Sequence, residues 1–138
     1  MTSLNRLRCV AVVALALTTP LAAVHAQAVT PAELLAAYAA KAAAPASAAR
    51  GQAFFNKNFG RDFAGCAACH GAVPTRPGKD LVSEKPIAPL APAANASRFS
   101  DRAKADYAFL INCKDVVGRE CTAGEKADIL SWLISLKP

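Results

Sequence analysis

The stretch Cys66-Ala67-Ala68-Cys69-His70 constrains this chain more than any other. It has the form C-x-x-C-H, in which two thiols can each add to one vinyl group of a porphyrin while the following imidazole binds the iron. The alternatives are a reducible cysteine pair or half of a zinc site, but zinc needs a second C-x-x-C or paired histidines. The motif therefore predicts one covalently attached haem c, with Cys66 and Cys69 as thioethers and His70 as an iron ligand.

Residues 1–26 have the features of an export signal. Arg6 and Arg8 form a basic start, residues 10–17 are apolar, and Val24-His25-Ala26 resembles a cleavage site. The apolar run is short for a bilayer span, which argues against a retained membrane anchor. We therefore expect cleavage after Ala26, a periplasmic location, and a single mature domain over residues 27–138 that does not span a membrane.

Cleavage would leave an unusual set of possible iron ligands. Met1 is the only methionine, and with His25 removed His70 is the only histidine. Electron-carrying cytochromes c commonly place a methionine or a second histidine on the other face of the iron. Here that position must be open, filled by water or held by an unusual side chain. The candidates are Asn112, Lys85, Tyr107 or a cysteine.

Four helices are expected in the mature chain. Thr30 and Glu33 form a capping box that begins a helix through Ala44, and Ser47 can cap a second helix that reaches about Asn58. A third helix should begin at Ser100 or Asp101 and stop near Asn112-Cys113. Thr122 and Glu125 form another capping box, which begins a last helix to about Leu136.

The segment between residues 72 and 96 contains five prolines and shows no periodicity. Proline removes backbone donors and breaks helices, so we expect an extended loop, long enough to wrap a planar apolar cofactor. No strand pattern or internal repeat is present. The chain is therefore expected to be all-α, with its helices packed around one haem and a long proline-rich loop.

Two further cysteines, Cys113 and Cys121, lie eight positions apart. In an oxidising compartment they most simply form a disulfide. A purely structural role is one interpretation. The other is that the closed loop limits the movement of the helix end at Asn112, directly before Cys113.

Several blocks of the sequence resemble the sphaeroides haem protein (SHP) family of oxygen-binding class I cytochromes c. The resemblance covers nearly the whole mature chain, in the same order, and the N-C-x-x-V-x-G-R-x-C block is far more specific than C-x-x-C-H. The matching blocks are residues 51–55, 66–70, 85–92, 98–101, 112–122 and 124–128.

The resemblance implies a ligand set and a mode of action. His70 and Asn112 would hold the iron, Cys66 and Cys69 would form the thioethers, and Cys113–Cys121 would be the disulfide. In the family the asparagine leaves the iron on reduction and exposes a site for oxygen, nitric oxide or carbon monoxide. A dihaem cytochrome c is the implied electron donor.

Three functions are consistent with these features. The first is a gas-binding cytochrome, the second a one-electron shuttle whose iron stays six-coordinate, and the third a haem enzyme that reacts with nitric oxide or oxygen. No residue is identified as catalytic. Basic residues are scattered along the chain, as on a solvated surface, although a basic patch could steer an acidic redox partner. No motif indicates a nucleic-acid partner.

Overall fold

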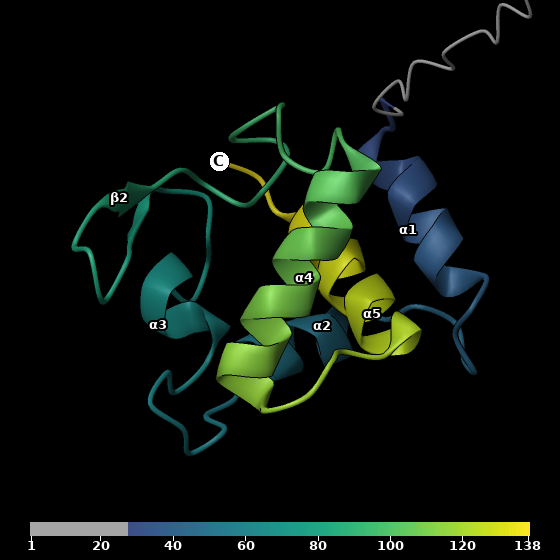
Figure 1. Cartoon of the computed structure of the whole chain (residues 1–138). Coiled ribbons are helices and arrows are strands. Elements are labelled where there is room, and N and C mark those ends of the chain that lie inside the picture. Colours follow the sequence, from purple (N-terminus) through teal and green to yellow (C-terminus); the bar gives the residue numbers. More distant parts are fainter. Residues whose placement is uncertain (1–27) are drawn as a thin grey trace, which may run out of the picture.

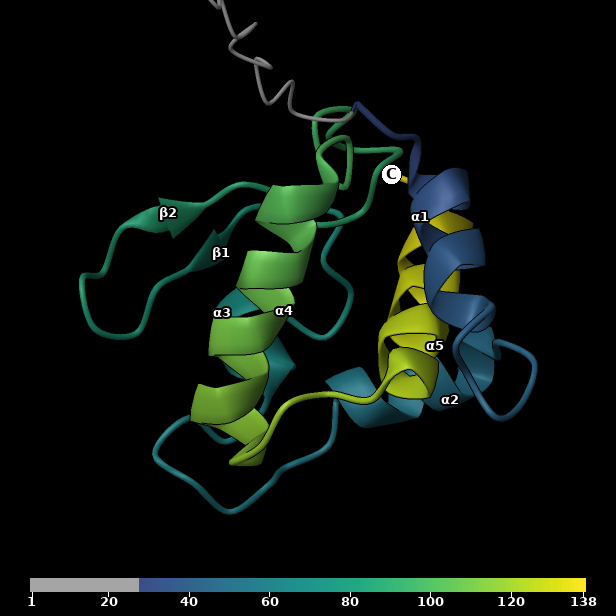
Figure 2. The same cartoon turned by 45° about the vertical axis from the view of Figure 1, so that its right-hand side comes forward.

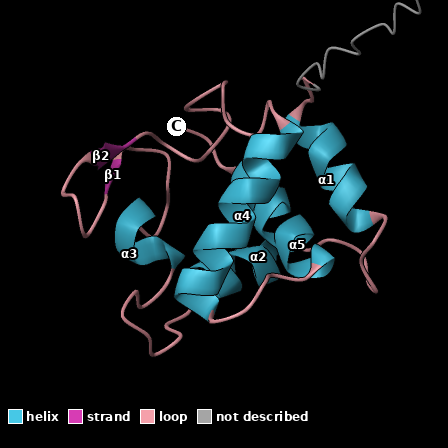
Figure 3. Ribbon diagram, viewed as in Figure 1, coloured by secondary structure: helices cyan, strands magenta, loops and turns pink. Residues whose placement is uncertain are grey.

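A computed structural model describes residues 28–138, and the expected export signal lies outside the described residues. The described part is mainly helical (Figure 3). Its elements are α1 (Pro31–Ala39), α2 (Ala48–Phe55), α3 (Cys66–His70), β1 (Gly78–Lys79), β2 (Pro86–Ile87), α4 (Arg102–Val117) and α5 (Ala123–Ser135). None of the helices in this part of the chain is both long and apolar enough to cross a membrane.

The four expected helices begin where the sequence predicted, because their first turns are capped by local side chains. The short helix α3 was not predicted and has no side-chain cap. The Thr30 hydroxyl accepts a hydrogen bond from the backbone N–H of Glu33 at 3.1 Å, and the Glu33 carboxylate accepts one from the Thr30 backbone at 2.7 Å. Thr122 and Glu125 form the same reciprocal capping box at the start of α5. Asp101 caps α4 by accepting from the backbone N–H of Lys104.

The helix ends were predicted less well. The helix α1 ends at Ala39 rather than Ala44, and α2 ends at Phe55 rather than Asn58. The helix α4 does not stop near Asn112-Cys113 but continues to Val117. It ends there because Gly118 adopts a left-handed conformation with φ 83°, which glycine tolerates and which satisfies carbonyls of the last turn.

A two-stranded hairpin interrupts the proline-rich loop, where no strand was expected. The strands β1 and β2 pair antiparallel, with Gly78 opposite Ile87 and Lys79 opposite Pro86. The hairpin rests on α3, since a Cβ atom at Gly78 would lie 2.1 Å from the carbonyl oxygen of Cys69. The proline-rich loop is therefore packed against the C-x-x-C-H helix through its backbone.

The helix α5 forms the centre of the packed core, with α2 and α1 against it (Figure 1). One cluster of buried side chains joins α1, α4 and α5 through Leu34, Tyr38, Ala105 and Leu130. A second cluster comprises Phe55, Ile129, Trp132 and Leu133.

The helix α4 lies apart from this helical core over much of its length. It makes few close backbone contacts with the other elements. In both Figure 1 and Figure 2 the β-hairpin lies on one side of α4, and α1 with α5 lies on the other. Side chains from α4, α3 and α5 line one common cavity.

Candidate haem site

The C-x-x-C-H helix forms one wall of a cleft in the described part of the structure. Cys66, Cys69 and His70 all line it, although they come from a helix of only five residues. The cavity measures about 850 Å³, counted with the part that opens to solvent. The two thiols and the imidazole of this helix therefore face one partly open cleft.

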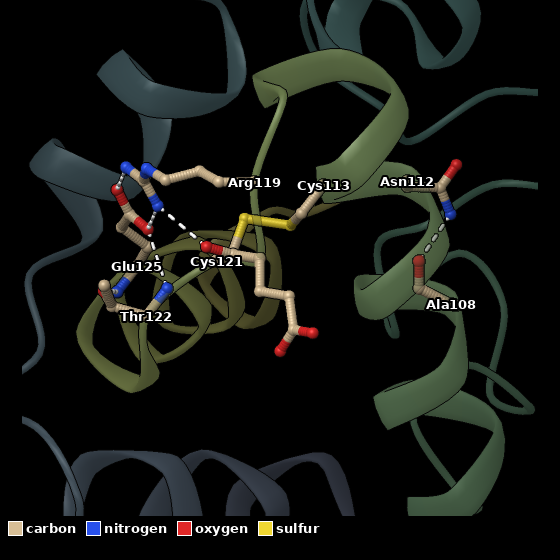
Figure 4. Close-up of a disulfide and its surroundings, with 8 residues drawn as sticks. Ala108, Asn112, Cys113, Arg119, Cys121, Thr122 and Glu125 are labelled. Carbon is tan, nitrogen blue, oxygen red and sulfur yellow. Dashed lines mark hydrogen bonds and ion pairs between the residues drawn. A yellow bond between two sulfur atoms is a disulfide. The ribbon is translucent and has the colours of Figure 1, made fainter.

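The helix α4 provides another wall. Its cavity-lining residues include the small Ala105 and Ala108, which leave space, and Asn112. The Asn112 side chain is exposed, and its Nδ2 donates a hydrogen bond to the carbonyl oxygen of Ala108 at 2.7 Å (Figure 4). The fold therefore brings Asn112 and His70, 42 positions apart in sequence, to the same cavity.

The rest of the cavity wall is apolar. Phe55, Ile129 and Leu133 contribute from the α2–α5 core, and Phe99 stacks on Phe109 with ring centroids 6.4 Å apart. The ring of Phe55 also lies 6.2 Å from that of His70, measured between centroids. Such a lining suits a flat apolar ring with a few directed polar contacts.

Burial shifts the pKa values of two groups on α3, Cys66 and His70. It raises the pKa of the Cys66 thiol to about 11, mainly by desolvating the thiolate. Burial also lowers the pKa of His70, with a further contribution from the positive charge of Arg98. The imidazole is therefore favoured in its neutral form, which is the form that binds a metal.

The residues of the cavity fit a covalently attached haem. Cys66 and Cys69 are both free thiols on α3, although another pair of cysteines in the same chain is oxidised. Across residues 28–138 no three His, Cys, Asp or Glu side chains gather into a group that could hold a metal ion. Two thiols and the imidazole that follows them, on one short helix, are the groups that covalent haem attachment uses.

The structure contains a disulfide between Cys113 and Cys121 at the end of α4 (Figure 4). Cys113 and Cys121 are both buried. On the segment that leads into α5, Arg119 forms an ion pair with Glu125 at 2.6 Å. These contacts tie the C-terminal part of α4, from the residue after Asn112 onward, to the start of α5.

Removing the disulfide should lower stability. In the double variant Cys113→Ser/Cys121→Ser, the free energy of unfolding is expected to fall by about 2–3 kcal/mol, because the unfolded chain is no longer constrained by the short closed loop. Denaturant unfolding of the purified haem protein measures this loss. Wild-type protein treated with a reductant is the control, because thioether bonds to haem are not cleaved by thiol exchange. Equal stability of variant and wild type would contradict the prediction.

Two of the alternative sixth ligands do not line the cavity. Tyr107 is 63% exposed, and neither it nor Lys85 is part of the wall. Arg98, in contrast, is a polar member of the wall whose role the sequence did not reveal. In the sequence, Arg98 could be noticed only because it belongs to the block 98–101, which resembles the SHP family.

The chain is similar to one family model and to known c-type cytochromes. Residues 41–133 match a family model described as "Domain of unknown function (DUF1924)". The chain is 49% identical over 107 residues to the cytochrome c-type protein SHP of Cereibacter sphaeroides, covering 75% of this chain and 82% of that protein. It is 39% identical over 89 residues to cytochrome c'' of Methylophilus methylotrophus, covering 62% and 61% of the two chains.

Solved structures of the same two proteins share the fold. The structure of oxidised SHP, described as an oxygen-binding cytochrome c, superposes with a TM-score of 0.73 at 47% identity and covers 78% of this chain and 97% of that one. Oxidised cytochrome c'' from Methylophilus methylotrophus gives a TM-score of 0.71 at 34% identity, covering 78% and 95%. The prediction of a class I cytochrome c-like fold is confirmed.

The protein is thus a monohaem c-type cytochrome with covalently bound haem c. It is largely helical, and its proline-rich loop and the α2–α5 core enclose the cavity beside the C-x-x-C-H helix. The chain belongs to the SHP family of c-type cytochromes.

Proposed function

We propose that this chain is a periplasmic cytochrome whose reduced form binds a diatomic gas such as oxygen or nitric oxide. Cys66 and Cys69 would hold the haem through thioethers, and His70 and Asn112 would bind its iron. When bound, the haem would supply an iron that can take up one electron and bind a diatomic gas. The similarity to SHP, described as an oxygen-binding cytochrome c, supports gas binding.

The observation that carries the proposal is the position of Asn112. It lines the same cavity as His70 but comes from α4. No methionine or second histidine occurs in residues 28–138 to compete for this position. An amide oxygen is a hard, neutral donor that suits ferric iron better than the softer ferrous ion. Asn112 is therefore the ligand expected to leave on reduction.

The Asn112 side chain is also placed so that it can move. It is exposed, and its only side-chain hydrogen bond within the described residues is the one to the carbonyl oxygen of Ala108. Losing one such bond costs about 0.5–1.5 kcal/mol. The backbone that carries Asn112 is held, in contrast, by the disulfide at the next residue. The proposed switch is thus a side-chain rotation on a fixed helix.

The electrons are proposed to come from another cytochrome, a dihaem cytochrome c being the donor that the family suggests. A periplasmic location is supported by the disulfide between Cys113 and Cys121, since such bonds persist in oxidising compartments.

Absorption spectra of the purified mature protein test the gas-binding proposal. The ferrous protein is expected to be high-spin, and its spectrum should shift when carbon monoxide is added, because an axial position has opened. Sharp low-spin ferrous bands that carbon monoxide leaves unchanged would contradict gas binding and would identify a six-coordinate electron shuttle. Turnover of oxygen or nitric oxide with an electron donor would instead indicate an enzyme.

A further inference from the structure

Among the residues of the described range 28–138 that line the cavity, Arg98 is the only one whose side chain carries a permanent charge. It is half-buried, and two of its nitrogen atoms are held by the proline-rich loop. Its Nε donates to the carbonyl oxygen of Pro89 at 2.9 Å, and its Nη2 donates to the carbonyl oxygen of Ala88 at 2.7 Å. The guanidinium is therefore oriented by backbone atoms beside the cavity.

No carboxylate in residues 28–138 forms an ion pair with Arg98. This distinguishes it from Arg50, which pairs with Asp128 at 2.8 Å, and from Arg119, which pairs with Glu125. Burial lowers the pKa of Arg98, which shows that its environment disfavours the charge. Charged groups that are partly removed from water are normally paired. The structure thus presents, at the cavity wall, a cation that has no carboxylate partner among residues 28–138.

We propose that Arg98 binds a propionate carboxylate of the haem. A guanidinium suits this task because its planar donors match a carboxylate and it keeps its charge at any physiological pH. Nη1 forms no hydrogen bond within the described residues, so it is available to the carboxylate. The inference rests on the proposed attachment of the haem in this cavity, but not on gas binding.

The contact would also connect the haem to the proline-rich loop. The same guanidinium that faces the cofactor holds the carbonyls of Ala88 and Pro89. Leu90, the next residue, lines the cavity. Arg98 therefore has two separable roles: its two loop hydrogen bonds position this segment, and its charge neutralises the cofactor carboxylate.

The test compares purified haem-loaded wild type with Arg98→Gln and Arg98→Lys. Two signals report on the carboxylate: the propionate bending bands in the resonance Raman spectrum, and the pH dependence of the midpoint potential. His70, Cys66 and Cys69 are the other titratable groups on the cavity wall, and in the loaded protein they are bound to the iron or to the porphyrin. Lys41→Gln is the control, since it removes one charge from an exposed residue just after α1.

In Arg98→Gln the propionate bands should shift, and the apparent pKa of the carboxylate in the potential-against-pH curve should rise by about 1–3 units. Lys41→Gln should change neither signal. Arg98→Lys keeps the charge, so its pKa should stay near the wild-type value, while its Raman bands shift because a different donor faces the carboxylate. If Arg98→Gln does not accumulate with haem, the Raman spectrum of Arg98→Lys tests the proposal by itself: shifted propionate bands support it, and unchanged bands contradict it.

A variant with wild-type Raman bands and an unchanged pH curve, but a lower melting temperature, would overturn the proposal. Arg98 would then only hold the loop. Wild-type protein without covalently bound haem would instead contradict the haem attachment at Cys66 and Cys69. The two failures are therefore distinguishable.

Discussion

Replacing Asn112 with methionine is expected to reduce the affinity of the ferrous protein for carbon monoxide by about 100-fold. A thioether is a soft ligand that stays on ferrous iron and raises the reduction potential. If methionine occupies the iron in about 99% of the reduced molecules, the apparent affinity for the gas falls by that factor, because only the open fraction can bind. Carbon monoxide titration of the reduced variant and a redox titration measure the two effects.

Two further variants make this experiment specific. Ile111→Met introduces the same side chain one residue earlier, at a position that is 40% exposed and does not line the cavity, so it should bind carbon monoxide like the wild type. Asn112→Ala removes the proposed ligand and should change the ferric spectrum while leaving carbon monoxide binding intact. A ferric spectrum of Asn112→Ala identical to the wild type would show that Asn112 does not bind the iron.

Replacing Gly51 with alanine is expected to lower the free energy of unfolding by roughly 3 kcal/mol, the upper end of the usual range for overpacking. The added Cβ would lie 1.9 Å from the carbonyl oxygen of Asp128 and 2.8 Å from the backbone nitrogen of Ile129. Both neighbours are backbone atoms, so they cannot rotate away. The helices α2 and α5 would have to separate at their closest contact.

Gly124→Ala is the matched control for this substitution. Gly124 is also helical, but the nearest atom to its added Cβ would be 3.7 Å away, an ordinary contact. This variant should be neutral or gain up to about 1 kcal/mol from better helix propensity. Denaturant unfolding of the two haem-loaded variants gives the comparison. Equal stability of Gly51→Ala and wild type would mean that the α2–α5 contact adapts more readily than its geometry indicates.

The positions of the helix starts were predictable because the interactions that set them are local. Each capping box joins residues three positions apart, such as Thr30 with Glu33 and Thr122 with Glu125. The end of α4 was not predicted, because Asn112-Cys113 reads locally as a polar stop. The helix continues past them through the buried Val116, and the left-handed Gly118 ends it. Val116 contributes by packing at the cavity wall, which involves distant residues.

The β-hairpin could not be predicted from the local sequence either. Its strands contain only two residues each, and one of them includes Pro86. No periodicity can signal so short a pairing. The hairpin depends on the close approach of Gly78 to the backbone of Cys69, a contact between separate segments that has no counterpart in the local sequence.

At the haem site, the sequence predicted the residues that lie next to one another in the chain. The motif at Cys66, Cys69 and His70 is one short helix, and the loss of every other histidine and methionine follows from composition once export is assumed. The packing of α4 brings Asn112 to the same cavity as His70. The proline-rich loop holds Arg98 at this cavity through a backbone carbonyl. Such placements depend on non-local contacts, whose geometry exists only after the chain has folded.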